Sequence, residues 1–141
     1  MIINNLANIR EASELKQEDM AKILGVSQSN YSRWETNKEF IPLKKLNILC
    51  NHFKVSMDYV FNFNRINTWN KKLKTDNYLI GNRIKEFRKK NNLTQKDLAN
   101  FLNTSQSTVS AYESGKTILL TSFAYQICSY YKISLDWLCG N

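Results

Sequence analysis

The sequence predicts an all-α protein made of two similar units in tandem. Of its 141 residues, 43% are hydrophobic and 12% aromatic, which is too many for a disordered chain. It has only four glycines and one proline, whereas an all-β chain of this length needs many turns. The chain also matches itself without a gap when shifted by 78 residues, with 17 identities between residues 4–61 and 82–139.

The repeat divides the chain into two units and a connecting segment. We expect domains at residues 1–61 and 80–141, and a linker at residues 62–79. Each unit lies near the lower size limit for an independent hydrophobic core. A unit of this size must therefore be compact and helical, or must lean on its neighbour.

The first two helices of each unit are indicated by apolar spacing and by capping residues. Apolar residues at helical spacing predict the first helix near Leu6–Arg10 and near Ile80–Phe87. Thr94 is a good N-cap for the second helix, with Asp97 three residues further on in a capping box. The first unit has Lys16 at the same position, which is a poorer cap.

A tight turn is expected between the second and third helices. Gly25 and Asn103 suit the left-handed position that follows a helix. Ser27 and Ser105 then suit the N-cap of the third helix. Two short helices joined in this way describe a helix-turn-helix.

Two further helices complete each unit. Asn37 and Gly115 mark the end of the third helix, and Pro42 suits the first turn of the fourth. Ser56 and Ser134 are expected to cap a short fifth helix. The expected core side of the fourth helix is Leu43, Leu46, Leu49, Cys50 and Phe53, or Phe123, Ala124, Ile127, Cys128 and Tyr131; Trp34, Tyr59, Tyr112 and Trp137 are also expected in the core.

The residues of the second and third helices resemble a known family. L-x-Q-x-D-x-A-x-x-L-G-V-S-Q-S-x-x-S-x-x-E and L-T-Q-x-D-L-A-x-x-L-x-x-S-Q-S-x-V-S-x-Y-E-x-G-K are similar to the Cro/C1-type (XRE) helix-turn-helix family. The resemblance covers nearly all of the chain except the linker. It implies a five-helix, lambda-repressor-like DNA-binding domain in each half, in which the third helix enters the major groove.

The candidate DNA contacts follow from this placement. Side chains at the start of the third helix reach base edges, while the second helix start and the residue after the third helix suit phosphates. The predicted DNA-binding residues are Gln17, Gln28, Ser29, Asn30, Ser32, Arg33 and Lys38 in the first unit, and Gln95, Gln106, Ser107, Thr108, Ser110 and Lys116 in the second.

The two units are not expected to read the same DNA sequence. Arg33 can pair with guanine, but its counterpart Ala111 can only touch a thymine methyl group. Charge is also uneven: residues 1–61 contain eight basic and seven acidic side chains, residues 80–141 eight and four. The first unit thus has the better base-reading set and the second the better charge for phosphates. Two alternatives remain open: both units bind DNA, or one binds DNA and the other a protein.

Other chemistry is not supported by the sequence. The three cysteines have no C-x-x-C spacing, and His52 has no histidine partner, so we expect no metal, cofactor or disulfide framework. Cys50 and Cys128 suit small core positions, and His52 a helix surface. Glu35 and Glu113 are expected to be structural, holding the turn or an arginine such as Arg10 or Arg88.

The linker is predicted to be at least partly helical. Phe63, Ile66, Trp69 and Leu73 are spaced as on one face of a helix, although four asparagines lower helix propensity. We expect this face to pack on a unit or on a second chain. The alternative is a flexible tether, whose fully extended reach of about 60 Å exceeds the roughly 34 Å between DNA half-sites.

The overall expectation is a sequence-specific double-stranded DNA-binding regulator, acting as a repressor by occupying a promoter. It is not expected to be an enzyme, to enter a membrane or to carry a small-molecule effector domain. A cytoplasmic location and a possible homodimer are part of this expectation. The alternative is a protein-interaction module in which one or both units bind a partner or mediate dimerisation.

Overall fold

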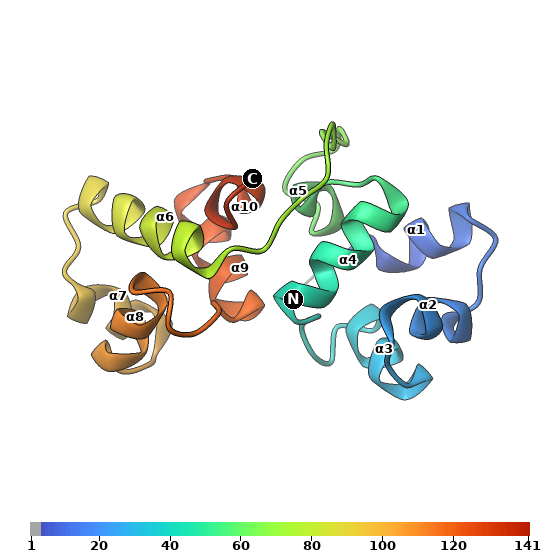
Figure 1. Cartoon of the computed structure of the whole chain (residues 1–141), viewed down its shortest axis with the longest axis horizontal. Helices are drawn as coiled ribbons and strands as arrows, with labels where there is room; N and C mark the ends of the chain where they lie inside the picture. The colour runs from blue at the N-terminus through green and yellow to red at the C-terminus, as the bar shows by residue number, and fades with distance from the viewer. Residues whose placement is uncertain (1–3) are drawn as a thin grey trace. The chain divides into compact units, whose positions relative to one another are not determined.

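The chain folds into two compact helical units. The computed structural model describes residues 4–141, and these residues form ten helices and no strand (Figure 1). One unit ends at Leu73 and the other begins at Lys74, so the boundary falls inside the predicted linker. The prediction of an all-α fold with five helices per unit is confirmed.

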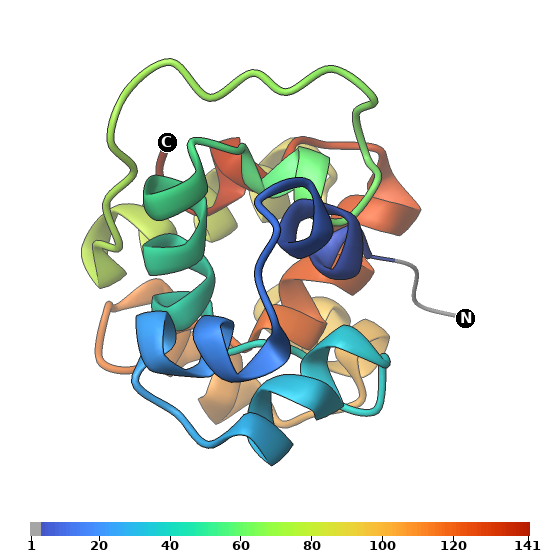
Figure 2. The same cartoon turned by 90° about the vertical axis from the view of Figure 1, so that its right-hand side faces the viewer.

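Unit 1 contains the first five helices. They are α1 (Leu6–Ala12), α2 (Gln17–Leu24), α3 (Gln28–Glu35), α4 (Leu43–Phe53) and α5 (Met57–Val60). Helix α3 packs against α1 and α2, and α4 packs against α2 and α5 (Figure 2). The core between them includes Leu6, Met20, Leu24, Tyr31, Leu46 and Leu49, each almost fully buried.

Unit 2 repeats this order with one longer helix. Its helices are α6 (Asn77–Lys90), α7 (Gln95–Leu102), α8 (Gln106–Glu113), α9 (Thr121–Tyr131) and α10 (Leu135–Leu138). Helix α8 packs against α6 and α7, and α10 packs against α6 and α9. Its core includes Ile80, Ile84, Leu98, Leu102, Val109 and Ile127.

The backbone conformation, like the order of helices, is repeated between the two units. Left-handed residues recur in pairs 78 positions apart, at Glu14 and Asn92, Gly25 and Asn103, Asn37 and Gly115, Lys54 and Lys132, and Asn62 and Gly140. These positions end helices or follow them. The two units therefore share one chain path even where their side chains differ.

The start of α6 shows why unit 2 has a glycine there. The Asp76 side chain accepts hydrogen bonds from the N–H groups of Tyr78 and Leu79, which begins the helix. A Cβ atom on Gly81 would lie 2.5 Å from the carbonyl oxygen of Tyr112 and 2.6 Å from that of Glu113. Only a residue without a side chain lets α6 approach the end of α8 so closely.

The helical face predicted for the linker is wrong. Residues 62–76 contain no helix, and of the predicted linker only residues 77–79 are helical, as the first turn of α6 (Figure 1). Asparagine side chains form hydrogen bonds with the backbone two residues further on: Asn64 accepts from the N–H of Ile66, and Asn67 accepts from the N–H of Trp69. Such bonds compete with helix formation. Leu73 is buried, whereas Ile66 is 72% exposed.

Several core assignments also need correction. Trp34 and Tyr112 are buried as predicted, but Tyr59 and Trp137 are only half-buried. Among residues of the fourth helix in each unit, Phe53, Phe123 and Tyr131 are likewise half-buried, while Thr121 is buried. Pro42 is the N-cap of α4, one residue before its first turn.

Candidate nucleic-acid interface

The helix-turn-helix of unit 1 is built by two local devices. Gly25, with φ of 68°, ends α2, and the N–H of Val26 returns to the carbonyl of Ala21 at 3.0 Å. The Ser27 hydroxyl then accepts the N–H of Asn30 at 3.2 Å and begins α3. The predicted three-residue turn is confirmed, and it brings α2 and α3 together (Figure 2).

Unit 2 uses the same devices with different residues. Asn103, with φ of 57°, replaces the glycine at the end of α7. Ser105 caps α8 by accepting the N–H of Thr108 at 3.2 Å. At the start of α7, Thr94 and Asp97 form the predicted capping box, with reciprocal bonds of 3.0 and 2.9 Å. In unit 1 the Asp19 side chain of this box accepts the N–H of Lys16 at 2.8 Å.

A buried ion pair fixes α3 to α1 in unit 1. Arg10 donates from Nε and Nη2 to the two carboxylate oxygens of Glu35, at 3.0 and 2.9 Å. Its Nη1 donates to the carbonyl of Leu15 at 2.9 Å, and Gln17 adds a bond of 3.4 Å to Glu35. The predicted structural role of Glu35 is confirmed.

The environment of Glu35 favours its charged form. Burial alone raises the pKa of this carboxyl, but the hydrogen bonds from Arg10 and Gln17 outweigh it and hold the pKa below its ordinary value. The bond to Glu35 raises the pKa of Arg10 against the opposing effect of burial. Burial is also the main cause of a strongly raised pKa at Tyr31. The pair is therefore ionised at neutral pH.

Gln17 and Gln95 lie at helix starts, as predicted, but their side chains turn inward. Each donates from Nε2 to the structural glutamate of its own unit, at 3.4 Å from Gln17 to Glu35 and 3.2 Å from Gln95 to Glu113. Both glutamines are half-buried. In this arrangement the glutamine links the start of α2 or α7 to the ion pair, and a second amide hydrogen remains for another acceptor.

The candidate base-reading residues lie along the accessible sides of α3 and α8. Among them, Gln28, Ser29, Gln106, Ser107 and Ser110 are exposed, while Asn30, Ser32, Arg33 and Thr108 are half-buried. Lys38 and Lys116, after these helices, are exposed. The structure thus places every predicted contact of the third helix on or beside the helix surface.

Some of these side chains already bind within the protein. Arg33 donates from Nη2 to the amide oxygen of Asn30, and its Nε lies 3.2 Å from the carboxylate of Glu39. In unit 2, the hydroxyls of Ser107 and Thr108 lie 3.0 and 2.8 Å from the cap hydroxyl of Ser105. These side chains are held in place before any ligand binds.

Glu39 is a participant that the sequence interpretation missed. It lies six residues after Arg33, beyond the end of α3, and both partners are part-exposed. Its counterpart in unit 2 is Thr117, just as the counterpart of Arg33 is Ala111. Both charged residues are replaced by uncharged ones in unit 2. This shared replacement could have indicated from the sequence that Arg33 and Glu39 form a pair.

The basic residues of α6 have two kinds of role. Arg88 is paired with Glu113, and Arg83 donates to the carbonyl of Trp137 at 2.7 Å while its guanidinium lies 4.9 Å from that ring centroid. Lys85, Lys89 and Lys90 are exposed. The positive surface of α6 therefore consists of three lysines.

The described part of the chain has neither a cluster of metal ligands nor a membrane-spanning helix. Residues 4–141 contain no group of three or more histidine, cysteine or acidic residues that could hold a metal ion. Cys50, Cys128 and Cys139 are buried thiols. Within those residues, no helix combines the length and the apolar character needed to span a bilayer.

Comparison with known proteins agrees with this geometry. A helix-turn-helix family model matches the chain twice, over residues 6–60 and 84–138. The HTH-type transcriptional regulator YobD of Bacillus subtilis (strain 168) is 35% identical over 60 residues, which cover 43% of this chain and 54% of that protein. The antitoxin PezA of Streptococcus pneumoniae serotype 4 is 32% identical over 56 residues, 40% of this chain and 35% of the relative. The chain thus spans about half and about a third of these relatives.

Proposed function

Because the chain belongs to the Cro/C1-type (XRE) helix-turn-helix family, we propose that it is a sequence-specific regulator that binds double-stranded DNA. The observation that carries this proposal is the pair of matching helix-turn-helix units, each with a capped third helix that exposes polar side chains. Such a helix fits the major groove, where its first residues reach base edges. The name of the Bacillus subtilis relative supports a regulator, and that of the antitoxin is compatible with repression.

We assign different tasks to the two units. Gln28 and Arg33 make α3 the better reader of bases, since these side chains bind adenine and guanine bidentately. Helix α8 contains no lysine or arginine, while residues 80–141 contain eight basic and four acidic side chains. Unit 1 thus specifies the site, and unit 2 anchors the protein on phosphates.

Repression follows from occupancy of a promoter, and no catalytic step is involved. The protein acts in the cytoplasm, either as one chain on two unlike half-sites or as a homodimer on a palindrome. The domains that bind are residues 1–61 and 80–141, joined by the linker 62–79. Fold alone does not decide between these modes.

The linker limits how a single chain spans DNA. Asn51 binds Leu73 through both backbone groups, at 2.9 and 2.7 Å, and Asp76 already caps α6. Lys74 and Thr75 are the only residues between Leu73 and Asp76. This stretch spans at most about 10 Å, far less than the roughly 60 Å of a free linker. The permitted spacing of the half-sites is therefore narrow.

The test is selection of binding sites from random duplex DNA with the intact protein near 150 mM salt. An enriched site whose affinity falls about 10³–10⁵-fold between 50 and 200 mM salt is expected for a regulator with six to ten phosphate contacts. Lys38→Ala and Lys116→Ala form a matched pair that reports which unit binds phosphate. If no sequence is enriched and affinity for DNA is weak at low salt, the protein-interaction alternative replaces this proposal.

The alternative has one specific observation in its favour. Arg33 is already paired with Asn30 and Glu39, so α3 presents little free positive charge. A helix of this kind can also pack against a protein. An apolar protein interface would respond only weakly to salt, so the same titration separates the two candidates.

A further inference from the structure

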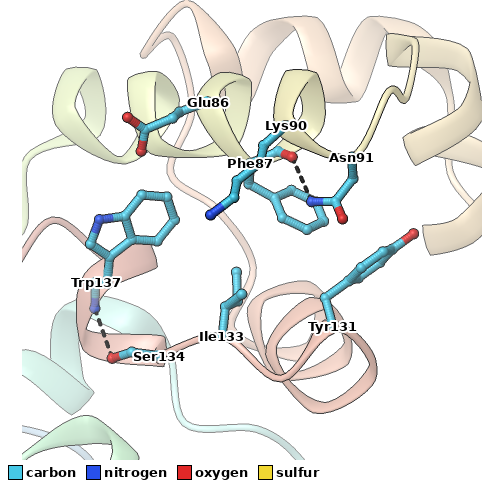
Figure 3. A pocket seen from close by; sticks show the side chains of 8 residues that line it. All are labelled: Glu86, Phe87, Lys90, Asn91, Tyr131, Ile133, Ser134 and Trp137. Atoms are coloured by element: carbon cyan, nitrogen blue, oxygen red, sulfur yellow. Dashed lines mark hydrogen bonds between the residues drawn. The ribbon is translucent and has the colours of Figure 1, made fainter.

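The two units contain the same cleft at equivalent positions. In unit 1 it lies between α1, the end of α4 and α5, and in unit 2 between α6, the end of α9 and α10 (Figure 3). Each residue lining the first cleft, apart from Asn67, has its counterpart 78 positions later lining the second. The cleft is therefore a feature of the repeated fold.

The chain itself shows what the cleft of unit 1 binds. The linker runs along it, and the Asn67 side chain donates to the carbonyl of Lys54 at 2.7 Å. The same amide accepts the N–H of Ser56 at 2.9 Å. Further along, Trp69 donates from its indole to Asn51 at 3.3 Å. An irregular segment of the chain thus docks through a side-chain amide on two backbone groups.

Unit 2 presents the same backbone wall without such an occupant. Lys132 has φ and ψ of 57° and 47°, close to the 55° and 51° of Lys54, so the backbone turns in the same way at both positions. The residues lining the cleft of unit 2 all come from α6, α9, α10 and the turns beside them. Its volume is about 670 Å³, against about 230 Å³ where Asn67 lines the cleft of unit 1.

The open cleft has a larger aromatic floor than its counterpart. Phe87, itself only 2% exposed, replaces Ile9 and supports the half-buried ring of Tyr131 edge to face, with ring centroids 4.8 Å apart. Trp137 replaces Tyr59 and faces the same space (Figure 3). Aromatic faces provide large apolar area for a bound chain at little conformational cost.

The charge of the cleft in unit 2 also differs from that of the cleft in unit 1. Lys90 replaces Ala12 and directs its ammonium group into the cleft (Figure 3). Among the described residues Lys90 forms no ion pair, and Glu86 lies at the side near Trp137. Two more lysines are exposed beside residues that line the cleft: Lys89 adjoins Lys90, and Lys132 adjoins Tyr131. The segment whose Asn67 lines the cleft of unit 1 is basic, with Arg65, Lys71 and Lys72, so a second copy of it would be repelled here.

We propose that the cleft of unit 2 binds an extended, acidic segment of a partner protein. A side-chain amide of the partner donates to the carbonyl of Lys132, as Asn67 does to that of Lys54. A carboxylate of the partner pairs with Lys90, and an apolar side chain covers the aromatic floor. None of the residues predicted to contact DNA lines this cleft, so the inference is independent of DNA binding.

The test uses two synthetic peptides and the full-length, isotope-labelled protein without DNA. One peptide is residues 64–73; the other carries Arg65→Glu, Lys71→Glu and Lys72→Glu. The acidic peptide is expected to shift the nuclear magnetic resonance signals of Trp137, Phe87 and Ile133 saturably. The basic peptide is expected to bind about tenfold more weakly, which corresponds to the reversed charge contacts.

Matched variants locate the contact. Lys90→Glu should weaken binding of the acidic peptide about tenfold, whereas Ala12→Glu, at the equivalent position of unit 1, should leave it unchanged. Adding Asn67→Ala to the acidic peptide should also weaken it. The proposal is overturned if the acidic peptide shifts no signal in the cleft of unit 2, or if Lys90→Glu has no effect. Tighter binding of the basic peptide would instead identify the linker of a second copy as the occupant.

Discussion

Arg88 and Glu113 face each other inside unit 2, with Nε and Oε2 only 2.7 Å apart and Nη2 and Oε1 3.1 Å apart. Arg10 and Glu35 repeat this arrangement in unit 1. In each unit the arginine also donates to a backbone carbonyl after its own helix, that of Leu93 or Leu15, at 2.9 Å. The pair thus joins the first helix, the loop that follows it and the third helix.

Loss of one partner from this pair should be costly. The side chains of Arg88 and Glu113 are 12% and 3% exposed. Glu113→Ala leaves a buried guanidinium without its partner, so we expect unit 2 to lose about 3 kcal/mol of unfolding free energy. Urea titration followed by Trp137 fluorescence measures this. Glu11→Ala, which removes an exposed carboxylate 3.6 Å from Arg10, is the control and should change nothing measurable.

Unit 1 should become less stable in acid because of Glu35. Its folded pKa lies below the ordinary value of 4.5, so its contribution is present above that pH and is lost as the pH falls through the folded pKa. The difference in unfolding free energy between the native chain and Glu35→Gln should therefore be constant above about pH 5 and shrink below it. Trp34 fluorescence during urea titration at a series of pH values measures it. A difference that does not change with pH would contradict the assignment.

Arg33 should determine one base pair of the binding site. Arg33→Ala is expected to cost about 1–3 kcal/mol at the selected site and to relax discrimination at one position. Competition binding with single-base variants of the site measures both effects. Lys38→Ala is the comparison, since loss of a phosphate contact should weaken all sequences alike. The same uniform loss in Arg33→Ala would show that Arg33 contacts phosphate.

Gly81 should resist replacement even by alanine. Helix propensity alone predicts that Gly81→Ala stabilises α6 by up to about 1 kcal/mol. The added Cβ would meet the carbonyl oxygens of Tyr112 and Glu113, so we expect a net loss of about 1–3 kcal/mol instead. Thermal unfolding of unit 2 decides the sign. Asn82→Ala, at the exposed neighbouring position, should be close to neutral.

Asn51 should control the effective length of the linker. Its amide binds both backbone groups of Leu73 and the indole of Trp69, so Asn51→Ala should release this segment. We expect Trp69 fluorescence to shift to the red and proteolysis between residues 62 and 76 to become faster. Ser129→Ala, at the corresponding position of unit 2, is the matched control. On DNA, Asn51→Ala should tolerate a wider range of half-site spacings.

Much of the fold could be predicted because its signals are local and occur twice. Thr94 with Asp97, Gly25 before Ser27, and Asn103 before Ser105 each define a helix end from a few neighbouring residues. The candidate contacts on α3 and α8 followed from their distance to these caps. Glu14, Lys54 and Lys132 could not be recognised as left-handed positions, because their residue types do not favour that conformation.

The linker shows the limit of this kind of inference. The spacing of Phe63, Ile66, Trp69 and Leu73 suits a helix, yet this segment is irregular, with bends and no helix. Asn51 accepts the N–H of Leu73, and Asn67 bonds to the backbone of Lys54 and Ser56. These hydrogen bonds join residues that are distant in sequence, and they replace the bonds that a helix would have made. Periodicity contains no information about such partners.

The sequence by itself determined the repeat, the five-helix order of each unit and the position of the helix-turn-helix, because these depend on short-range spacing and capping. The tertiary structure decided which side chains are already engaged: Gln17 and Gln95 with the buried ion pairs, and Arg33 with Glu39. It also decided that the linker residue Asn67 lines one cleft, while no linker residue lines its counterpart, which has Lys90 and Trp137. These features depend on contacts between residues far apart in the chain, which exist only once the helices have packed.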